Sequence, residues 1–220
     1  GGIWFSDAIN TVSPGFARDI TTPYQGFGLA PYLSKKGDSF YGILNGVDYS
    51  AWDPATDPHL WANYSADDPK GKDVNRRELL SLFDLNPNPQ GPVFGIVSRL
   101  TGQKGFEILP DALPIFLHRE DVRLVVLGSG EEGHERYFQW LRDAFPGKVA
   151  FFRGYDEPLA HRIEAGADIF LMPSRYEPCG LNQMYSLRYG TAPLVRSTGG
   201  LADTVERWDY YMGDDAVDES

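Results

Sequence analysis

Five short apolar runs, separated by segments long enough for a helix, constrain the fold of this 220-residue chain more than any other feature. The runs lie at residues 93–97, 122–127, 149–152, 168–172 and 192–195. Apolar strands that alternate with helices are typical of a parallel sheet with both faces covered. We therefore expect an α/β fold built on a doubly wound, Rossmann-like parallel sheet.

Composition narrows the possible functions. Hydrophobic residues make up 42% of the chain, which supports a packed core, and no apolar run is long enough to predict a membrane span. The formal net charge of -11 argues against a nucleic-acid surface. The single cysteine, Cys179, allows no internal disulfide and favours a reducing, cytoplasmic location.

No metal cofactor is expected. The four histidines show no metal-ligand spacing, and the sequence contains no Asp-x-Asp triplet to hold a divalent cation against a diphosphate. Any bound diphosphate would therefore need protein cations and helix ends to neutralise it.

Residues 1–41 lack the regular alternation, and we interpret them as the tail of a preceding domain followed by a linker. Ser13 before Pro14 suits an N-cap and first helical position, which predicts a short helix through Ile20. Glycines and prolines then favour a loop up to residue 41. The absence of an initiator methionine suggests a chain cut from a longer protein.

Residues 42–220 form the second expected unit, incomplete at its C-terminus. A turn at Asn45 and Gly46 should precede irregular surface structure over 51–72 and a helix over 74–83. We expect His161 and Arg162 on a solvent-exposed helix face. An acidic tail over 213–220 should be frayed.

The loop after the fourth apolar run carries Glu177. Such strand-to-helix loops lie at the carboxyl edge of a parallel sheet, where open α/β folds bind ligands, and the N–H groups of the next helix favour an anion. Gly180 permits close approach of a ligand, whereas Cys179 suits a small packing residue better than a reactive thiol. For this loop alone, a plain turn with a solvated glutamate is an equal alternative.

A second loop at the same edge carries Arg99 and Lys104. Arginine offers a planar fork to phosphate oxygens and lysine a mobile point charge, so together they suit a diphosphate. Two solvated cations would explain one isolated loop, but the loops with Glu177 and with residues 198–200 should open on the same edge. The sequence therefore predicts a shared anion-binding pocket.

Two more strand ends should lie nearby. Residues 128–133 match the G-x-G-x-x-G fingerprint of dinucleotide binding, but Glu131 and Glu132 put negative charge where a pyrophosphate would sit. We interpret this stretch as a tight turn near a nucleotide, with a dehydrogenase site as the weaker alternative. Tyr155 suits stacking on a purine or, at least as well, an aromatic cap on the sheet edge.

Taken in order, several of these motifs resemble those of the bacterial glycogen synthases and plant starch synthases. They are Asn-Thr-Val-Ser-Pro at 10–14, Asn-Gly-Val-Asp at 45–48, Arg-Leu-Thr at 99–101, Gln-Lys-Gly at 103–105, Glu-Pro-Cys-Gly-Leu at 177–181 and Thr-Gly-Gly-Leu-Ala-Asp-Thr-Val at 198–205. The resemblance implies one half of a GT-B glycosyltransferase, truncated at both ends. Such an enzyme moves glucose from ADP-glucose to the non-reducing end of an α-1,4-glucan, with retention and without a metal.

The resemblance also implies a role for each matching residue. Arg99 and Lys104 would stabilise the departing ADP, and Glu177 would contact the glucosyl hydroxyls. The implied donor-binding residues are Asn45, Tyr155, Cys179, Gly180, Leu181, Asn182, Thr198, Gly199 and Gly200. Asn182 stands where the family usually has threonine, which puts a hydroxyl contact to phosphate in doubt.

The implied partners are ADP-glucose, an α-1,4-glucan acceptor and the N-terminal domain of the same enzyme, which this chain lacks. We therefore expect a donor-binding half that does not elongate glucan by itself. Two alternatives stay open. One is a non-catalytic carbohydrate-binding module of the same fold, with Trp52, Trp61 and Tyr64 as a stacking surface, although these side chains suit a half-buried cluster better. The other is a transferase that uses UDP-glucose or another sugar nucleotide.

Overall fold

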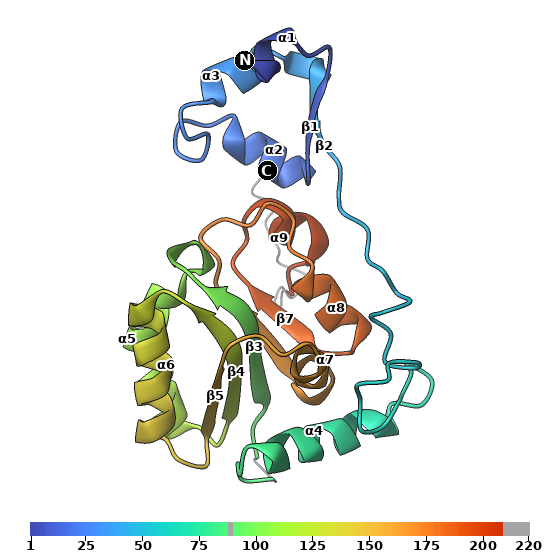
Figure 1. Cartoon of the computed structure of the whole chain (residues 1–220), viewed down its shortest axis with the longest axis vertical. Helices are drawn as coiled ribbons and strands as arrows, with labels where there is room; N and C mark the ends of the chain where they lie inside the picture. The colour runs from blue at the N-terminus through green and yellow to red at the C-terminus, as the bar shows by residue number, and fades with distance from the viewer. Residues whose placement is uncertain (88–89, 209–220) are drawn as a thin grey trace, which may run out of the picture.

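A five-stranded parallel sheet is the centre of the computed structural model, which describes residues 1–87 and 90–208 (Figure 1). The strands are β3 (Val93–Leu100), β4 (Arg123–Gly130), β5 (Val149–Arg153), β6 (Ile169–Met172) and β7 (Ala192–Val195). Their spatial order is β5-β4-β3-β6-β7, and the five predicted runs all contribute to it. The predicted parallel sheet is confirmed. Its order reverses between β3 and β6, and open sheets bind ligands at such a switch point.

Helices cover both faces of this sheet (Figure 1). They are α5 (Leu109–Arg119) and α6 (Glu132–Ala144) on one face, and α4 (Lys70–Leu82), α7 (Glu157–Gly166), α8 (Asn182–Arg188) and α9 (Gly199–Thr204) on the other. Alternate residues of β4 point to opposite faces. Leu124 and Val126 join the core beneath α5 and α6, whereas Val125 and Leu127 join the core beneath α4 and α7. Strands that are apolar on both faces thus produce the doubly wound arrangement.

Residues 1–42 form a small N-terminal unit next to α9 (Figure 1). Its elements are α1 (Gly2–Phe5), β1 (Ile9–Thr11), α2 (Pro14–Ile20), α3 (Ala30–Ser34), the 3-10 turn η1 (Gly37–Ser39) and β2 (Phe40–Gly42). The Ser13 hydroxyl accepts a hydrogen bond from the Phe16 N–H at 2.9 Å, which confirms the predicted cap of α2. The prediction of a loop up to residue 41 is wrong, because β2 pairs in parallel with β1 after α3.

The connecting segment, residues 43–69, joins the small unit to α4. No turn forms at Asn45 and Gly46, contrary to expectation, and α4 begins at Lys70 rather than at residue 74. The segment is irregular as predicted, but it is more than surface structure. Trp52 stacks between the rings of His161 and Tyr185, with centroid distances of 3.7 and 4.0 Å.

His161 is buried, so the prediction of a solvent-exposed side chain is wrong. Its Nδ1 lies 2.7 Å from Oδ2 of the buried Asp57, and the Tyr189 hydroxyl donates to the same oxygen at 2.6 Å. Burial opposes the ionised form of Asp57, but these hydrogen bonds outweigh it and lower the pKa of this carboxyl. The connecting segment is therefore anchored to α7 by a buried polar cluster.

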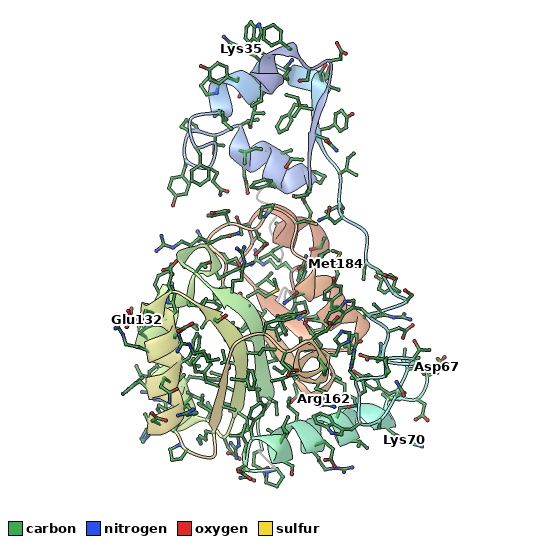
Figure 2. The ribbon with its side chains drawn as sticks, viewed as in Figure 1. Lys35, Asp67, Lys70, Glu132, Arg162 and Met184 are labelled. Carbon is green, nitrogen blue, oxygen red and sulfur yellow. The ribbon has the colours of Figure 1, made fainter. Side chains whose placement is uncertain are left out.

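Arg162 lies on α7 beside the connecting segment (Figure 2), where its Nε donates to the His59 carbonyl at 2.9 Å. Its guanidinium lies 4.7 Å from the centroid of the Trp61 ring. The Tyr64 hydroxyl is likewise used inside the protein, because it donates to the Tyr189 carbonyl at 2.7 Å. Trp52 and Trp61 are half-buried and Tyr64 is buried, which confirms the half-buried cluster that the sequence favoured over an aromatic sugar-stacking surface. The predicted acidic tail at 213–220 lies outside the described residues.

Candidate functional site

Two loops meet at the carboxyl edge of the sheet beside its switch point. One follows β3 and contains the 3-10 turn η2 (Gly102–Lys104), and the other follows β6 and carries Glu177. The Arg175 N–H donates to the Gln103 carbonyl at 2.9 Å, and the Gln103 side chain donates to the Tyr176 carbonyl at 3.3 Å. Gly105 is left-handed at φ 72, and a Cβ there would lie 2.0 Å from the Pro173 carbonyl oxygen. The two loops therefore pack without room for a side chain at this point.

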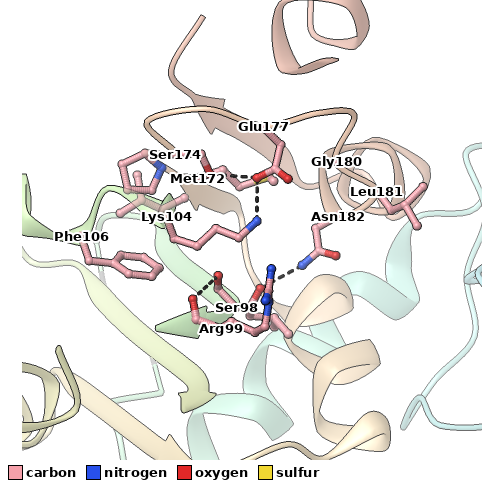
Figure 3. Close-up of a pocket in the computed structure, with 13 residues that line it drawn as sticks. Ser98, Arg99, Lys104, Phe106, Met172, Ser174, Glu177, Gly180, Leu181 and Asn182 are labelled. Carbon is pink, nitrogen blue, oxygen red and sulfur yellow. Dashed lines mark hydrogen bonds and ion pairs between the residues drawn. The ribbon is translucent and has the colours of Figure 1, made fainter. Parts of the chain in front are cut away.

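A largely buried ion pair joins the loops (Figure 3). The Lys104 Nζ lies 2.6 Å from the Glu177 Oε2, with side-chain exposures of 17% and 9%. The Ser174 hydroxyl donates to the same carboxylate oxygen at 3.0 Å. Lys104 thus has one carboxylate partner, and its side chain also lines the adjacent cavity.

A cavity of about 200 Å³ opens beside this pair and contains the predicted catalytic residues Arg99, Lys104 and Glu177 in its lining. Six of the predicted site residues line it, the others being Gly180, Leu181 and Asn182. Arg99 is exposed, and within residues 1–87 and 90–208 its guanidinium has no hydrogen bond or ion pair. An unpaired arginine next to a paired lysine leaves the cavity with a local positive charge in a chain of negative net charge.

Asn182, at the start of α8, also lines this cavity. Its side-chain nitrogen donates to the Val97 carbonyl at 2.9 Å, which ties α8 to β3. The Ser186 hydroxyl lies 2.8 Å from the Asn182 carbonyl and 2.7 Å from the carboxylate of the fully buried Glu164. Burial raises the pKa of Glu164 to about 8, so this buried carboxyl keeps its proton at neutral pH. A protonated Glu164 donates to Ser186, which leaves the single hydroxyl proton of Ser186 for the Asn182 carbonyl.

A second cavity of about 250 Å³ shares the wall formed by Arg99 and Asn182. Tyr155, 78% exposed, lines it together with Gly128 and Ser129 from the end of β4. Each cavity is smaller than the roughly 300 Å³ at which ligand pockets begin, and the two share Val97, Ser98, Arg99 and Asn182 in their linings. The prediction of a tight turn is wrong for Gly128–Gly130, which form the end of β4 beside β3, and a nucleotide near this stretch stays a prediction.

Glu131 is one of the two acidic residues expected to repel a pyrophosphate, and its carboxylate accepts a hydrogen bond within the protein. Its Oε1 accepts from the Gly102 N–H at 2.9 Å. Glu135, one turn further along α6, accepts from the Gly130 N–H at 2.9 Å and pairs with Arg153 at 2.7 Å. These carboxylates hold the end of β4 and the loop after β3 in place, and the Gly130 N–H of the fingerprint is already bonded within the protein.

Several predicted donor-binding residues do not line either cavity. Asn45 is exposed in the connecting segment, and Cys179 is 3% exposed and packs inside the protein. Thr198, Gly199 and Gly200 lie behind the Glu177 loop, where the Gly200 N–H donates to the Glu177 carbonyl at 2.9 Å. Their geometry makes residues 198–200 a support of this loop, and direct contacts from them to a donor stay a prediction.

Some residues of the site were not predicted. Ser174 holds the Glu177 carboxylate, and Ser98, Phe106 and Met172 are among the other residues that line the first cavity. A serine three residues before Glu177 is a signal that local spacing offered, because short-range hydroxyl bonds are common in loops. The Phe106 contact depends on how the helix after β3 packs, which no local pattern specifies.

Among the described residues, no group of three or more His, Cys, Asp or Glu side chains is arranged to hold a metal ion. In the same part of the chain, every helix is too short or too polar to cross a bilayer.

A doubly wound parallel sheet with a cationic cavity at its switch point has the arrangement in which open α/β proteins bind ligands. A family model described as "Glycosyl transferases group 1" matches residues 80–214, and one described as "Starch synthase catalytic domain" matches residues 1–35. The chain belongs to the glycosyl transferases of group 1, and within them it is homologous to the glycogen and starch synthases.

The glycogen synthase of Myxococcus xanthus is 55% identical over 205 residues, covering 93% of this chain and 43% of that protein. Glycogen synthase 1 of Geobacter metallireducens is 51% identical over 209 residues, covering 95% and 41%. The solved catalytic domain of starch synthase IV from Arabidopsis thaliana, bound to ADP and acarbose, is 38% identical with a TM-score of 0.88 and covers 99% and 44%. The chain thus spans less than half the length of these relatives.

A more distant solved structure shows the fold alone. Anabaena HepE in complex with UDP-glucose is 19% identical with a TM-score of 0.60, covering 94% of this chain and 49% of that one. The predicted fold, one half of a GT-B glycosyltransferase, is confirmed by these neighbours together with the sheet topology.

Proposed function

We propose that this chain carries the donor-binding part of a retaining glucosyltransferase that transfers glucose from ADP-glucose to the non-reducing end of an α-1,4-glucan. One observation carries the proposal: Arg99, Lys104 and Glu177 line one cavity at the switch point of the sheet. The names of the relatives support the reaction, and the ADP bound to the starch synthase IV domain supports the donor.

Within this proposal, Arg99 and Lys104 bind the diphosphate without a metal. Negative charge grows on the leaving phosphate oxygen as the sugar bond breaks, and fixed cations in a partly enclosed site stabilise that charge. Among the described residues, the Arg99 guanidinium has no ion-pair partner that a diphosphate would have to displace. The Lys104 ammonium, in contrast, must be shared between Glu177 and the diphosphate. Glu177 in turn accepts hydrogen bonds from the glucosyl hydroxyls as Lys104 moves toward phosphate.

Tyr155 lines the second cavity and suits the adenine. In this proposal Arg99 and Asn182, which line both cavities, would lie between the base and the sugar. Residues 42–220 form the donor-binding domain of the proposal, and residues 1–41 belong to the acceptor domain and linker. The rest of the enzyme would supply the acceptor surface, so we expect no glucan elongation by this chain alone. A cytoplasmic location and the absence of a cofactor stay predictions from the sequence.

Calorimetric titration with ADP tests the site. Arg99→Ala and Lys104→Ala should each weaken ADP binding about tenfold or more, because hydrogen bonds to charged groups contribute about 1.5–3 kcal/mol. Arg119→Ala, which removes an exposed arginine at the end of α5, should bind as the unchanged chain does. Equal affinities for all four proteins would contradict the assignment of the cavity.

Competition between ADP and UDP separates the proposed donor from the UDP-glucose alternative. We expect ADP to displace UDP and UDP to displace ADP poorly. If glucan pulls down the chain but the chain binds no nucleotide, the non-catalytic carbohydrate-binding module is favoured instead.

A further inference from the structure

The small N-terminal unit contacts the sheet domain through a reciprocal pair of hydrogen bonds between α2 and α9, which lie next to each other (Figure 1). Asp203 on α9 accepts from the Gly15 N–H of α2 at 2.6 Å. Asp19 on α2 accepts from the Gly199 N–H of α9 at 3.0 Å. Each helix thus supplies the carboxylate that satisfies a free backbone N–H in the first turn of the other.

At this contact the backbones of α2, α9 and the Glu177 loop lie too close together for a side chain between them. A Cβ on Gly15 would lie 2.6 Å from the Gly199 carbonyl oxygen. Gly199 has φ 44, and a Cβ there would lie 2.2 Å from the Glu177 carbonyl oxygen. Because real Cβ atoms do not approach so closely, α2, the start of α9 and the Glu177 loop are stacked directly on one another.

These stacked segments are connected to the cavity through Glu177. The Gly200 N–H donates to the Glu177 carbonyl at 2.9 Å, and the Glu177 carboxylate binds Lys104 at 2.6 Å. A second contact runs in parallel, since the Phe27 ring of the small unit meets the Tyr176 ring edge-on at a centroid distance of 5.9 Å. The position of the small unit is therefore linked mechanically to the loop that carries Glu177.

We propose that Asp19 and Asp203 form a reciprocal latch that seats residues 1–42 on α9 and thereby fixes the position of Glu177. Both are positioning residues, because neither lines the cavity and both act through residues 199–200. The latch itself does not depend on the nucleotide. Only its consequence for ligand binding rests on the proposed function.

Hydrogen exchange followed by mass spectrometry on the 220-residue chain tests the latch. Asp19→Ala and Asp203→Ala should each raise exchange at residues 197–203 and 174–181 about fivefold, the size expected for loss of a helix-capping contact. Asp19→Asn and Asp203→Asn keep an acceptor oxygen at the same position, so they should retain most of the protection. Peptides from β3 and β4 should exchange as in the unchanged chain, which shows that the variants are folded.

Gly15→Ala reaches the same open state without altering either aspartate, because its Cβ would collide with the Gly199 carbonyl. It should raise exchange in the same two peptides. Unchanged exchange at 174–181 in the alanine variants, or equal effects of alanine and asparagine, would overturn the latch.

ADP titration of the same variants separates this inference from the proposed function. If the latch holds the Glu177 loop, whose Gly180 and Leu181 line the cavity, Asp203→Ala should weaken ADP binding about threefold and Asp203→Asn should not. Failure of the unchanged chain to bind ADP would contradict the proposed function and leave the exchange result as the test of the latch.

Discussion

Two acid–base clusters in this protein differ in what surrounds them. The Lys104–Glu177 pair lies at the carboxyl edge of the sheet and opens onto a cavity beside an unpaired arginine. The Asp57–His161 pair lies beneath the connecting segment, where Trp52 and the Tyr189 hydroxyl close it off. A pair that faces a cavity can exchange its partner for a ligand, whereas an enclosed pair whose groups are satisfied contributes to the fold. Surroundings, rather than residue types, therefore separate the binding cluster from the structural one.

Removal of the enclosed carboxylate should give the largest effect. Asp57→Ala leaves the His161 ring and the Tyr189 hydroxyl without their acceptor, and breaking such a buried pair costs about 3–5 kcal/mol. Urea denaturation followed by circular dichroism measures the loss. Asp67→Ala, at an exposed position of the same segment (Figure 2), should change stability by less than about 0.5 kcal/mol. A loss below about 1 kcal/mol for Asp57→Ala would contradict the structural role of this cluster.

The buried carboxyl of Glu164, near the structural cluster, should make stability depend on pH. Burial raises its pKa to about 8 from an ordinary 4.5, so the folded protein holds a proton that the unfolded chain releases between these values. The free energy of unfolding should therefore fall as pH rises from 4.5 to 8, by at most about 1.4 kcal/mol per pH unit. Burial also lowers the pKa of Lys72 to about 8, and this group makes stability recover between pH 8 and 10.5.

Glu164→Gln should flatten the decline below pH 8 and leave the recovery above it. Denaturant midpoints at several pH values measure both limbs, and Glu78→Gln on the exposed face of α4 serves as the matched control. An unchanged slope in Glu164→Gln would show that this carboxyl is not the titrating group.

A smaller effect tests the open cluster. Glu177→Gln removes the charge that competes with a diphosphate for Lys104, so ADP affinity should rise by up to about fivefold, the most that a partly exposed ion pair contributes. Glu107→Gln removes a carboxylate of the same edge that pairs with Arg175 instead, and it should leave ADP affinity nearly unchanged. Calorimetry on both variants makes the comparison. Weaker ADP binding by Glu177→Gln would mean that Glu177 does not compete for Lys104.

The sheet and the two charged loops could be predicted because their signals are local. The β4 residues are apolar on both faces. Arg99 lies at the end of β3, and Lys104 and Glu177 follow strands whose carboxyl ends must share one edge. The burial of His161 could not be predicted, because Asp57 lies 104 residues away in sequence. The strand β2 has three residues and exists because β1 is beside it. The support role of Gly199 likewise depends on a contact with the Glu177 loop that only the fold creates.

A crystal structure of the chain with bound ADP tests the central claim most directly. We predict diphosphate oxygens within hydrogen-bond distance of the Arg99 guanidinium and the Lys104 Nζ, with the Lys104–Glu177 separation longer than the 2.6 Å of the free protein. ADP bound elsewhere, or a diphosphate that contacts neither cation, would contradict the account.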